Sequence, residues 1–371
     1  MPSAIVVGAG VFGAALADRL AADGWEVTLL DRDEPGHARA ESGGESRLIR
    51  YSHGADAWYT RSAWRARELW RELGSDLLVE SGLVWFARRE DGWEADSERV
   101  LREVGVPVER LAPESAAELF PSVRTDDLAF VLHEPAAGIL RAREATRALV
   151  RRATARGATL ERADARPAGA ALRLGDGRRL EADRVVWACG AWLARLFPEL
   201  VALRVTQQDL FFFDAPAEWS TPPLPGFVDY DGAAYGLGAL DGNGVKVAPD
   251  VDGPAFDPDQ WPRSAQPENE LRAREYLEWR FPALAGAPIT SHAACQYSLT
   301  GDTHFLAAPH PEHGGTVWLY GGGSGHGFKH GPELAERMAA WLSEDEGPEP
   351  RFGLGPRSPD RSLRTAGAAG G

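Results

Sequence analysis

Cysteine is scarce in this sequence, which has two cysteines among 371 residues. Two cysteines cannot form a disulfide framework, so they fit a reducing cytoplasm, or one of them has a special chemical role. Long apolar runs are also missing: no segment approaches the roughly 20 residues that cross a bilayer, and no secretory signal is visible ahead of the first strand. We therefore expect a cytoplasmic protein that does not associate with membranes.

Positive charge is in deficit as well. The chain has 40 Lys and Arg residues against 55 Asp and Glu residues, a formal net charge of −15 and an isoelectric point of about 5.1. A protein that binds a phosphate backbone carries a basic face, so nucleic acid is not an expected partner. Lysine is especially scarce in this arginine-rich chain. The length favours two domains, at roughly 100–200 residues each.

The most informative segment covers residues 4–31. It reads as a short apolar strand, a glycine-rich turn, an Ala/Leu-rich helix and a second strand. Gly8, Gly10 and Gly13 have the G-x-G-x-x-G spacing, which permits a tight turn, a close approach of the backbone to a pyrophosphate and close helix–strand packing. The helix N-terminus offers N–H groups to phosphates. Asp31 ends the second strand, where a carboxylate accepts hydrogen bonds from a ribose diol, so the segment predicts a dinucleotide site.

The rest of the chain mixes strand and helix patterns. Residues 81–88 predict a strand, and residues 97–105 and 113–121 predict helices. Residues 133–140 predict a loop that enters a long basic-faced helix at 143–157. The mixture indicates an α/β (α+β) fold.

This layout predicts a discontinuous nucleotide-binding domain and a second domain built on an antiparallel sheet that binds the substrate. The active site is expected between them, where ligand pockets often lie. The tail, rich in Gly, Pro, Ser and Ala, is expected to be partly disordered, beyond Arg351. The predicted ranges are 1–80, 141–202 and 291–345 for the nucleotide domain, 81–140 and 203–290 for the second domain, and 346–371 for the tail.

Four blocks of sequence resemble the family of monomeric sarcosine oxidase and N-methyltryptophan oxidase, which are D-amino-acid-oxidase-like, FAD-dependent amine oxidases. The blocks are the glycine fingerprint, DRVVWACGAW at 183–192, CQYSLTGDTHFLAAPHPEH at 295–313 and GGGSGHGFKHGPELAE at 321–336. The resemblance covers residue 4 to about 345. It implies a glutathione-reductase-type, Rossmann-like FAD-binding domain, oxidation of a C–N bond to an imine, and reduction of O₂ to H₂O₂.

The resemblance also assigns cofactor-binding residues. The family attaches FAD through a thioether between the flavin 8α-methyl group and a cysteine that corresponds to Cys295, which fixes the flavin geometry. Alternatively, Cys295 is a small buried hydrophobic residue, as we expect for Cys189. The cofactor-binding residues implied here are Gly8, Gly10, Gly13, Asp31, Arg47, Cys295, Gly325, Gly327, Phe328 and Lys329.

Arg50 and Lys329 match the family's carboxylate-binding residues. A guanidinium grips a carboxylate through two bonds and an ammonium adds a third, although a structural ion pair is the alternative for each. Tyr235 and Tyr297 match tyrosines that line the substrate pocket, or are core aromatics. Asp250 stands where sarcosine oxidase has a histidine, so it either binds a cationic group on a larger substrate or caps a turn. This departure argues against sarcosine itself as the substrate.

Three further residues are implied in catalysis. Lys246 matches a lysine that promotes the reaction of reduced flavin with O₂, because a fixed positive charge stabilises developing superoxide. Arg47 would lie near the flavin, and His326 would polarise the region beside it; a local salt bridge and an ordinary polar histidine are the alternatives. We expect no metal site. The expected partners are a small-molecule amine or amino acid and O₂, and the family favours a monomer.

Two other hypotheses remain. A flavin dehydrogenase, or a specialised-metabolism oxidase acting on a cyclic or aromatic amino acid, would use the same motifs. An NAD-dependent enzyme or a non-catalytic nucleotide-binding regulator would explain the glycines, but would leave Cys295, Lys246 and the SGHGFK motif without a role.

Overall fold

The computed structural model describes residues 1–343 and 347–358. The N-terminal strand lies inside a six-stranded sheet whose order is β19-β20-β13-β1-β2-β9. Neighbouring strands are parallel except for the β19–β20 pair at one edge. In that order the strands are Leu306–Pro309, Val317–Gly321, Arg184–Trp187, Ser3–Val7, Glu26–Asp31 and Thr159–Arg162.

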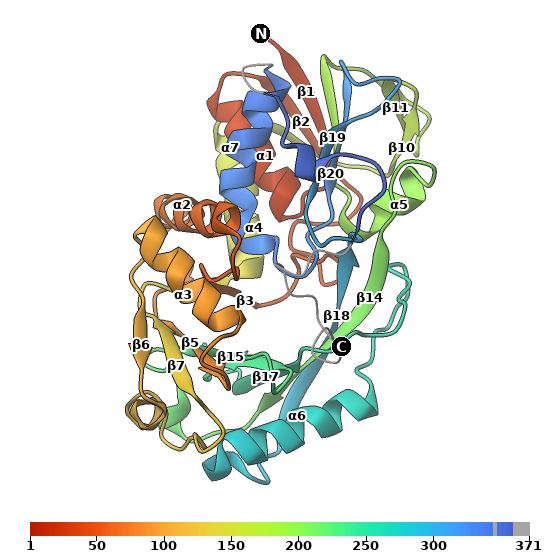
Figure 1. The fold of residues 1–371 in the computed structure, drawn as a ribbon. Helices are drawn as coiled ribbons and strands as arrows, with labels where there is room; N and C mark the ends of the chain where they lie inside the picture. The colour runs from red at the N-terminus through yellow and green to blue at the C-terminus, as the bar shows by residue number, and fades with distance from the viewer. Residues whose placement is uncertain (344–346, 359–371) are drawn as a thin grey trace.

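Three helices pack together beside this sheet (Figure 1): α1 (Val11–Ala22), α4 (Ala142–Ala155) and α7 (Gly331–Leu342). Helix α1 contacts both of the others, and almost all of its residues are buried. A Cβ atom at Gly13 would lie 1.9 Å from the Gly8 carbonyl oxygen, so glycine is required where the helix meets the turn after β1. The helix start is thereby held against the sheet edge where β1 and β2 end.

The second large sheet has eight strands in the order β18-β14-β17-β16-β15-β5-β7-β6. Its pairs are antiparallel except for β15 with β5. The long strands β14 and β18 run from the six-stranded sheet to the far end of the molecule, where helix α6 (Pro267–Arg280) lies (Figure 1). In sheet order the strands are Ile289–Leu299, Arg204–Phe213, Val245–Pro249, Ala234–Leu237, Gly226–Asp229, Leu83–Ala87, Phe130–Glu134 and Glu109–Leu111.

Smaller elements connect the two large sheets. Strand β3 (Ser46–Ile49) pairs with β8 (Gly138–Arg141), which also pairs with β4 (Leu78–Val79). Helices α2 (Ala57–Leu73) and α3 (Trp93–Val104) pack against each other. The remaining strands, β10 to β12, and the short helix α5 are Ala165–Ala168, Ala171–Leu174, Arg179–Leu180 and Leu193–Leu196.

The α/β fold predicted from the sequence is confirmed, with two local corrections. Residues 133–140 are not a continuous loop: β7 ends at Glu134 and β8 begins at Gly138, which leaves only 135–137 as a turn. Both strands pair with partners distant in sequence. The helix predicted at 113–121 is a short 3₁₀ helix, Pro113–Glu118, of which only Ala116 is buried. Long-range strand pairing decides the first segment, and a lack of buried residues decides the second, rather than the local sequence preference of either.

The end of the chain is packed as far as the structure describes it. Phe352 is fully buried, and Arg357 donates to Asp302 at 2.8 Å. Phe352 and Arg357 thus lie in the segment predicted to be partly disordered, but both are packed against the rest of the protein. The remainder of that segment, 359–371, lies outside the described residues. In the part of the chain that is described, no helix is both long and apolar enough to traverse a bilayer.

Candidate cofactor and substrate site

A cavity of about 460 Å³ extends from the carboxyl ends of β1 and β2 to strands β14, β17 and β18. Of the site residues predicted from the sequence, only Gly13 is not in its lining; it instead packs α1 against the preceding turn. The predicted residues that line the cavity are Gly8, Gly10, Asp31, Arg47, Arg50, Tyr235, Lys246, Asp250, Cys295, Tyr297, Gly325, His326, Gly327, Phe328 and Lys329.

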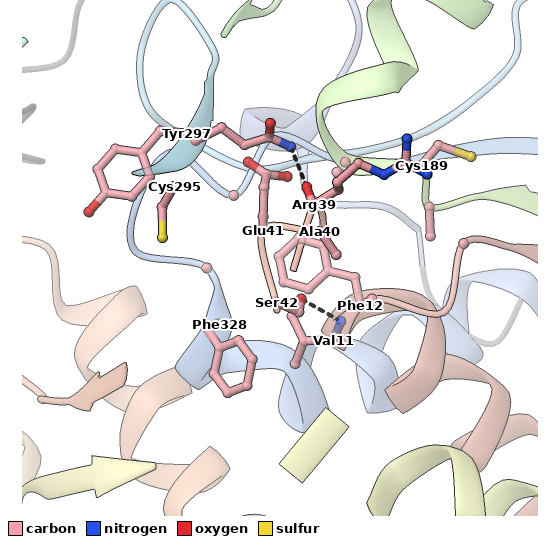
Figure 2. A pocket seen from close by; sticks show the side chains of 18 of the residues that line it. Val11, Phe12, Arg39, Ala40, Glu41, Ser42, Cys189, Cys295, Tyr297 and Phe328 are labelled. Atoms are coloured by element: carbon pink, nitrogen blue, oxygen red, sulfur yellow. Dashed lines mark hydrogen bonds between the residues drawn. The ribbon is translucent and has the colours of Figure 1, made fainter. Parts of the chain in front are cut away.

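The turn after β1 has the geometry of a dinucleotide cradle. Gly8 has a φ of 107°, and a Cβ there would lie 2.4 Å from the Ala188 carbonyl oxygen. Gly10 is the N-cap of α1 without a side-chain cap, and Val11 N donates to Ser42 Oγ at 2.9 Å (Figure 2). Asp31 accepts a hydrogen bond from Ala9 N at 2.6 Å, and burial raises the pKa of its carboxyl group. The residues present therefore fit a bound dinucleotide.

Glu41 is a half-buried carboxylate in the cavity wall that the sequence did not single out. It accepts hydrogen bonds from Ser298 N and Oγ, both at 2.8 Å, and burial raises its pKa. Figure 2 shows it between the Cys295–Tyr297 end of the cavity and Cys189. The polar loop that contains Glu41 gives no local signal for this position, because its contact with β18 depends on tertiary packing.

The two cysteines occupy different parts of the cavity wall (Figure 2). Cys295 lies on β18 beside a cluster of Leu210, Phe212 and Ala248. Cys189 donates to the Val7 carbonyl oxygen at 3.3 Å, and burial raises its pKa. Cys189 thus combines the core packing we expected with a place at the dinucleotide end.

Lys246 is 4% exposed and lies on β17 between two buried valines. Its Nζ is 3.3 Å from Ser46 Oγ and 3.4 Å from the Ser46 carbonyl oxygen. Burial, followed by the charge of Arg47, lowers the pKa of Lys246 to about 8. Arg47 itself donates to the Ser46 and Glu41 carbonyl oxygens, both at 2.7 Å, rather than to a carboxylate. Two cationic side chains are thus held together by backbone acceptors.

Arg50 and Lys329 form a second pair of cations. The Arg50 guanidinium lies over the rings of Trp85, at 5.3 Å, and Trp93, at 6.0 Å, and donates to the Ser52 carbonyl oxygen. Lys329 is 3% exposed and donates from Nζ to the His326 carbonyl oxygen at 2.8 Å. Burial, followed by the charge of Arg50, lowers the pKa of Lys329 well below its usual value.

Neither Arg50 nor Lys329 has a carboxylate within salt-bridge distance in the described part of the chain. Lys329 and Lys246 are the only lysines in the sequence, and both line the same cavity. A buried cation without a counter-charge is costly to desolvate unless a ligand supplies one. The arrangement is therefore suited to an anionic group, and the structural ion pairs considered from the sequence do not form here.

Tyrosines line the wall near Asp250. The hydroxyl groups of Tyr235 and Tyr297 are 3.1 Å apart. Burial raises the pKa of Tyr235 to about 12 and the pKa of Tyr297 well above its usual value. The charge of Asp250 contributes to both increases, which places the carboxylate near the pair. Tyr230, which the sequence did not indicate, lies 3.5 Å from Arg50 Nη2.

The SGHGFK segment, residues 324–329, forms part of the cavity wall. A Cβ at Gly325, whose φ is 76°, would lie 2.7 Å from the Tyr297 ring, and one at Gly327 would lie 2.9 Å from the Phe12 ring. His326 Nε2 donates to the Thr303 carbonyl oxygen at 3.0 Å, and burial lowers the pKa of the ring well below its usual value. The two glycines allow this close packing, and His326 lines the cavity as a neutral ring.

Comparison with known proteins yields one family model, described as "FAD dependent oxidoreductase", which matches residues 3–341. Monomeric sarcosine oxidase of Bacillus sp. (strain B-0618) is 30% identical over 355 residues, 90% of each chain. N-methyl-L-tryptophan oxidase of Salmonella arizonae is 27% identical over 368 residues, 95% of this chain and 96% of that protein. The solved structure of L-proline dehydrogenase from P. horikoshii has a TM-score of 0.83 at 20% identity, covering 94% of this chain and 95% of that one.

Proposed function

Because this chain belongs to the FAD-dependent oxidoreductase family, we propose that it oxidises the C–N bond of a carboxylate-bearing amine to an imine, with reduction of O₂ to H₂O₂. The observation that carries the proposal is the Arg50–Lys329 pair, two neighbouring cations without a carboxylate partner among the described residues. They line a cavity that continues into the dinucleotide cradle. FAD held by the Gly8–Gly10 turn and Asp31 would supply the two-electron acceptor, with O₂ as the final electron acceptor.

The chain's own residues position the substrate. Arg50 offers a planar donor set and Lys329 a point charge, so together they fix a carboxylate and with it the orientation of the adjoining amine. Positioning of this kind supplies much of the rate enhancement when no side-chain nucleophile is needed. Tyr235, Tyr297 and Asp250 line the same cavity, and we propose that they contact the rest of the substrate. We propose that Asp250 favours a substrate with an additional polar or cationic group.

The first experiment is a peroxide assay under air with N-methyl, cyclic and aromatic amino acids, each tested beside its carboxamide. We expect peroxide from at least one acid and at least 100-fold less from its amide, because the amide lacks the charge that the cation pair binds. Substrate-dependent reduction of a dye without peroxide would instead favour the flavin dehydrogenase. A purified protein that is colourless and cannot bind FAD would contradict both hypotheses.

We propose that Cys295 holds FAD covalently, which its place on β18 in the cavity wall supports. Cys295→Ser should release the yellow colour into the supernatant on acid precipitation, whereas the wild-type colour stays in the pellet. Cys189→Ser is the matched control, because Cys189 lines the same cavity and should leave retention unchanged. A wild-type polypeptide mass without the added mass of FAD, measured on yellow protein, would contradict the covalent link.

We also propose the two-domain division predicted from the sequence. All strands of the six-stranded sheet fall within 1–80, 141–202 and 291–345. The boundary at 290/291 cuts β18, which pairs with β14 along its length, so a boundary after Leu299 follows the sheets more closely. Cys189 and Cys295 do not form a disulfide, which supports our proposal that the protein acts in a reducing cytoplasm. We also propose that it is a monomer.

A further inference from the structure

Three histidines from separate turns meet beside the Arg50–Lys329 pair: His53, His326 and His330. Their ring centroids are 5.3 Å apart for His53 and His330, 6.0 Å for His326 and His330, and 6.1 Å for His53 and His326. One ring nitrogen from each lies within 4.8 Å of the other two. His53 is 1% exposed and His330 is fully buried. The chemistry of this buried cluster depends on which ring nitrogen of each histidine carries a hydrogen.

Two of the three tautomers follow from carbonyl acceptors. His53 Nδ1 lies 3.0 Å from the Tyr51 carbonyl oxygen, and His326 Nε2 lies 3.0 Å from the Thr303 carbonyl oxygen. A carbonyl oxygen can only accept, so each of these nitrogens carries the hydrogen. The other nitrogens, His53 Nε2 and His326 Nδ1, therefore present bare lone pairs.

The third tautomer follows from a carboxylate. His330 Nδ1 lies 2.9 Å from Ser62 Oγ, and Ser62 Oγ donates to Glu333. Burial raises the pKa of the Glu333 carboxyl group, but its salt bridge with Arg337 and its hydrogen bond from Ser62 favour the ionised form, which accepts. Ser62 has one hydrogen and gives it to Glu333, so His330 Nδ1 must donate to Ser62. His330 Nε2 is thus the third bare nitrogen.

The three bare nitrogens have no hydrogen-bond partner among the described residues, although all three are buried. A water molecule has two hydrogens and would leave one of the three lone pairs unsatisfied. A metal ion accepts all three. Imidazole nitrogens suit Zn²⁺, Cu²⁺ and Ni²⁺, and the outer hydrogen bonds to carbonyls and a Ser–Glu pair are the support that metal-bound histidines usually have.

We propose that His53 Nε2, His326 Nδ1 and His330 Nε2 form a binding site for a divalent transition-metal ion of the Zn²⁺ type. Zinc–nitrogen bonds of about 2.0–2.1 Å place tetrahedral ligands about 3.3 Å apart and their ring centroids about 5 Å apart. The His53–His330 pair already has this centroid spacing. A movement of His326 by about 1 Å toward the other two completes the triangle.

The neighbouring charges oppose a dication. Lys329 and Arg50 act electrostatically on all three rings, and the charge of Glu134 partly offsets that of Lys329. A carboxylate bound between Arg50 and Lys329 would reduce this repulsion, so it should tighten metal binding, and the metal should tighten carboxylate binding by the same factor. This coupling, unlike the metal site itself, rests on the proposed function.

The sequence predicted no metal site, and its one usable signal was not recognised. His326 and His330 are four residues apart, a spacing that places two metal ligands on one face of an α-helix, although here the Phe328–His330 segment is a 3₁₀ turn. The third ligand, His53, is far away in sequence and gives no local indication. Tertiary packing alone brings it to the other two.

The test uses the flavin-loaded protein after removal of metals with a chelator. Equilibrium dialysis against Zn²⁺ with elemental analysis should find one equivalent per chain, and Zn²⁺ should raise the unfolding temperature. His53→Phe and His330→Phe retain an aromatic ring and should each weaken Zn²⁺ binding at least 10-fold. His310→Phe is the matched control, because His310 stacks on His313 outside the cluster and should change neither readout.

Co²⁺ added to the wild-type protein gives a test that does not depend on the folding of a variant. Visible absorption bands of a tetrahedral Co²⁺ site, displaced by Zn²⁺, are the expected result. The absence of such bands, or Zn²⁺ binding that both His→Phe variants retain unchanged, would overturn the metal site. Zn²⁺ binding is also measured with and without acetate, a carboxylate that should tighten it. Zn²⁺ binding that is lost in these variants but is not changed by acetate would support the metal site and contradict carboxylate binding by the Arg50–Lys329 pair.

Discussion

Arg50→Ala should lower kcat/KM for a carboxylate-bearing amine by about 30- to 1,000-fold. Truncating one partner of a buried, hydrogen-bonded charge pair costs roughly 2–5 kcal/mol, and each 1.4 kcal/mol corresponds to tenfold. We expect a loss in the lower part of this energy range because Arg50 is only partly buried. Lys329→Ala should have an effect of similar size, since the ammonium lies within the same cavity wall. Steady-state kinetics and the dissociation constant of a carboxylate inhibitor measure both variants.

The control for this prediction is chemical. A carboxamide analogue lacks the anionic group, so the wild-type protein and the Arg50→Ala variant should bind it with equal, low affinity. Arg50→Lys should recover part of the lost affinity, because it restores the charge without the two-pronged geometry. Carboxylate inhibitors that keep their full affinity for both alanine variants would remove the basis of the proposed function.

The dinucleotide cradle could be predicted from the sequence because its parts are contiguous. Gly8, Gly10 and Asp31 are separated by one helix, so strand, turn and helix form a unit whose geometry follows from local rules. The family and the α/β fold that this segment and the later motifs indicated are confirmed. Lys246 also carried a local signal, since a lysine between two valines on a predicted strand is seldom solvated.

Other parts of the site had no local signal. Glu41 and Tyr230 are ordinary polar-loop and strand-end residues in sequence, and only the packing of their loops against β18 and Arg50 gives them a place in the cavity. Strand β8 was predicted as a loop because its extended form depends on pairing with β3 and β4. Contacts between residues 60 or more positions apart decide these features, and a single sequence does not encode them in any short pattern.

Lys246→Met should slow the reaction of the substrate-reduced protein with O₂ by about 100- to 1,000-fold. Loss of one preorganised group that stabilises developing negative charge has an effect of this size in a dry site. Methionine keeps the length and burial of the side chain, so the rate of anaerobic reduction by substrate should change little. Stopped-flow measurement of the two half-reactions separates these effects, and reoxidation at the wild-type rate would show that Lys246 has another role.

The pH dependence of the same step follows from the lysine's pKa. Burial lowers this pKa to about 8, so the ammonium is present below that pH and is lost as the pH rises through it. Reoxidation by the wild-type protein should therefore fall above pH 8, whereas Lys246→Met should show no such fall. Lys246→Arg keeps its charge at high pH and should retain more of the rate there. Reduction by substrate should change in the opposite direction, because the free-base amine is the reactive form, so a parallel fall in both half-reactions would point to general destabilisation rather than to Lys246.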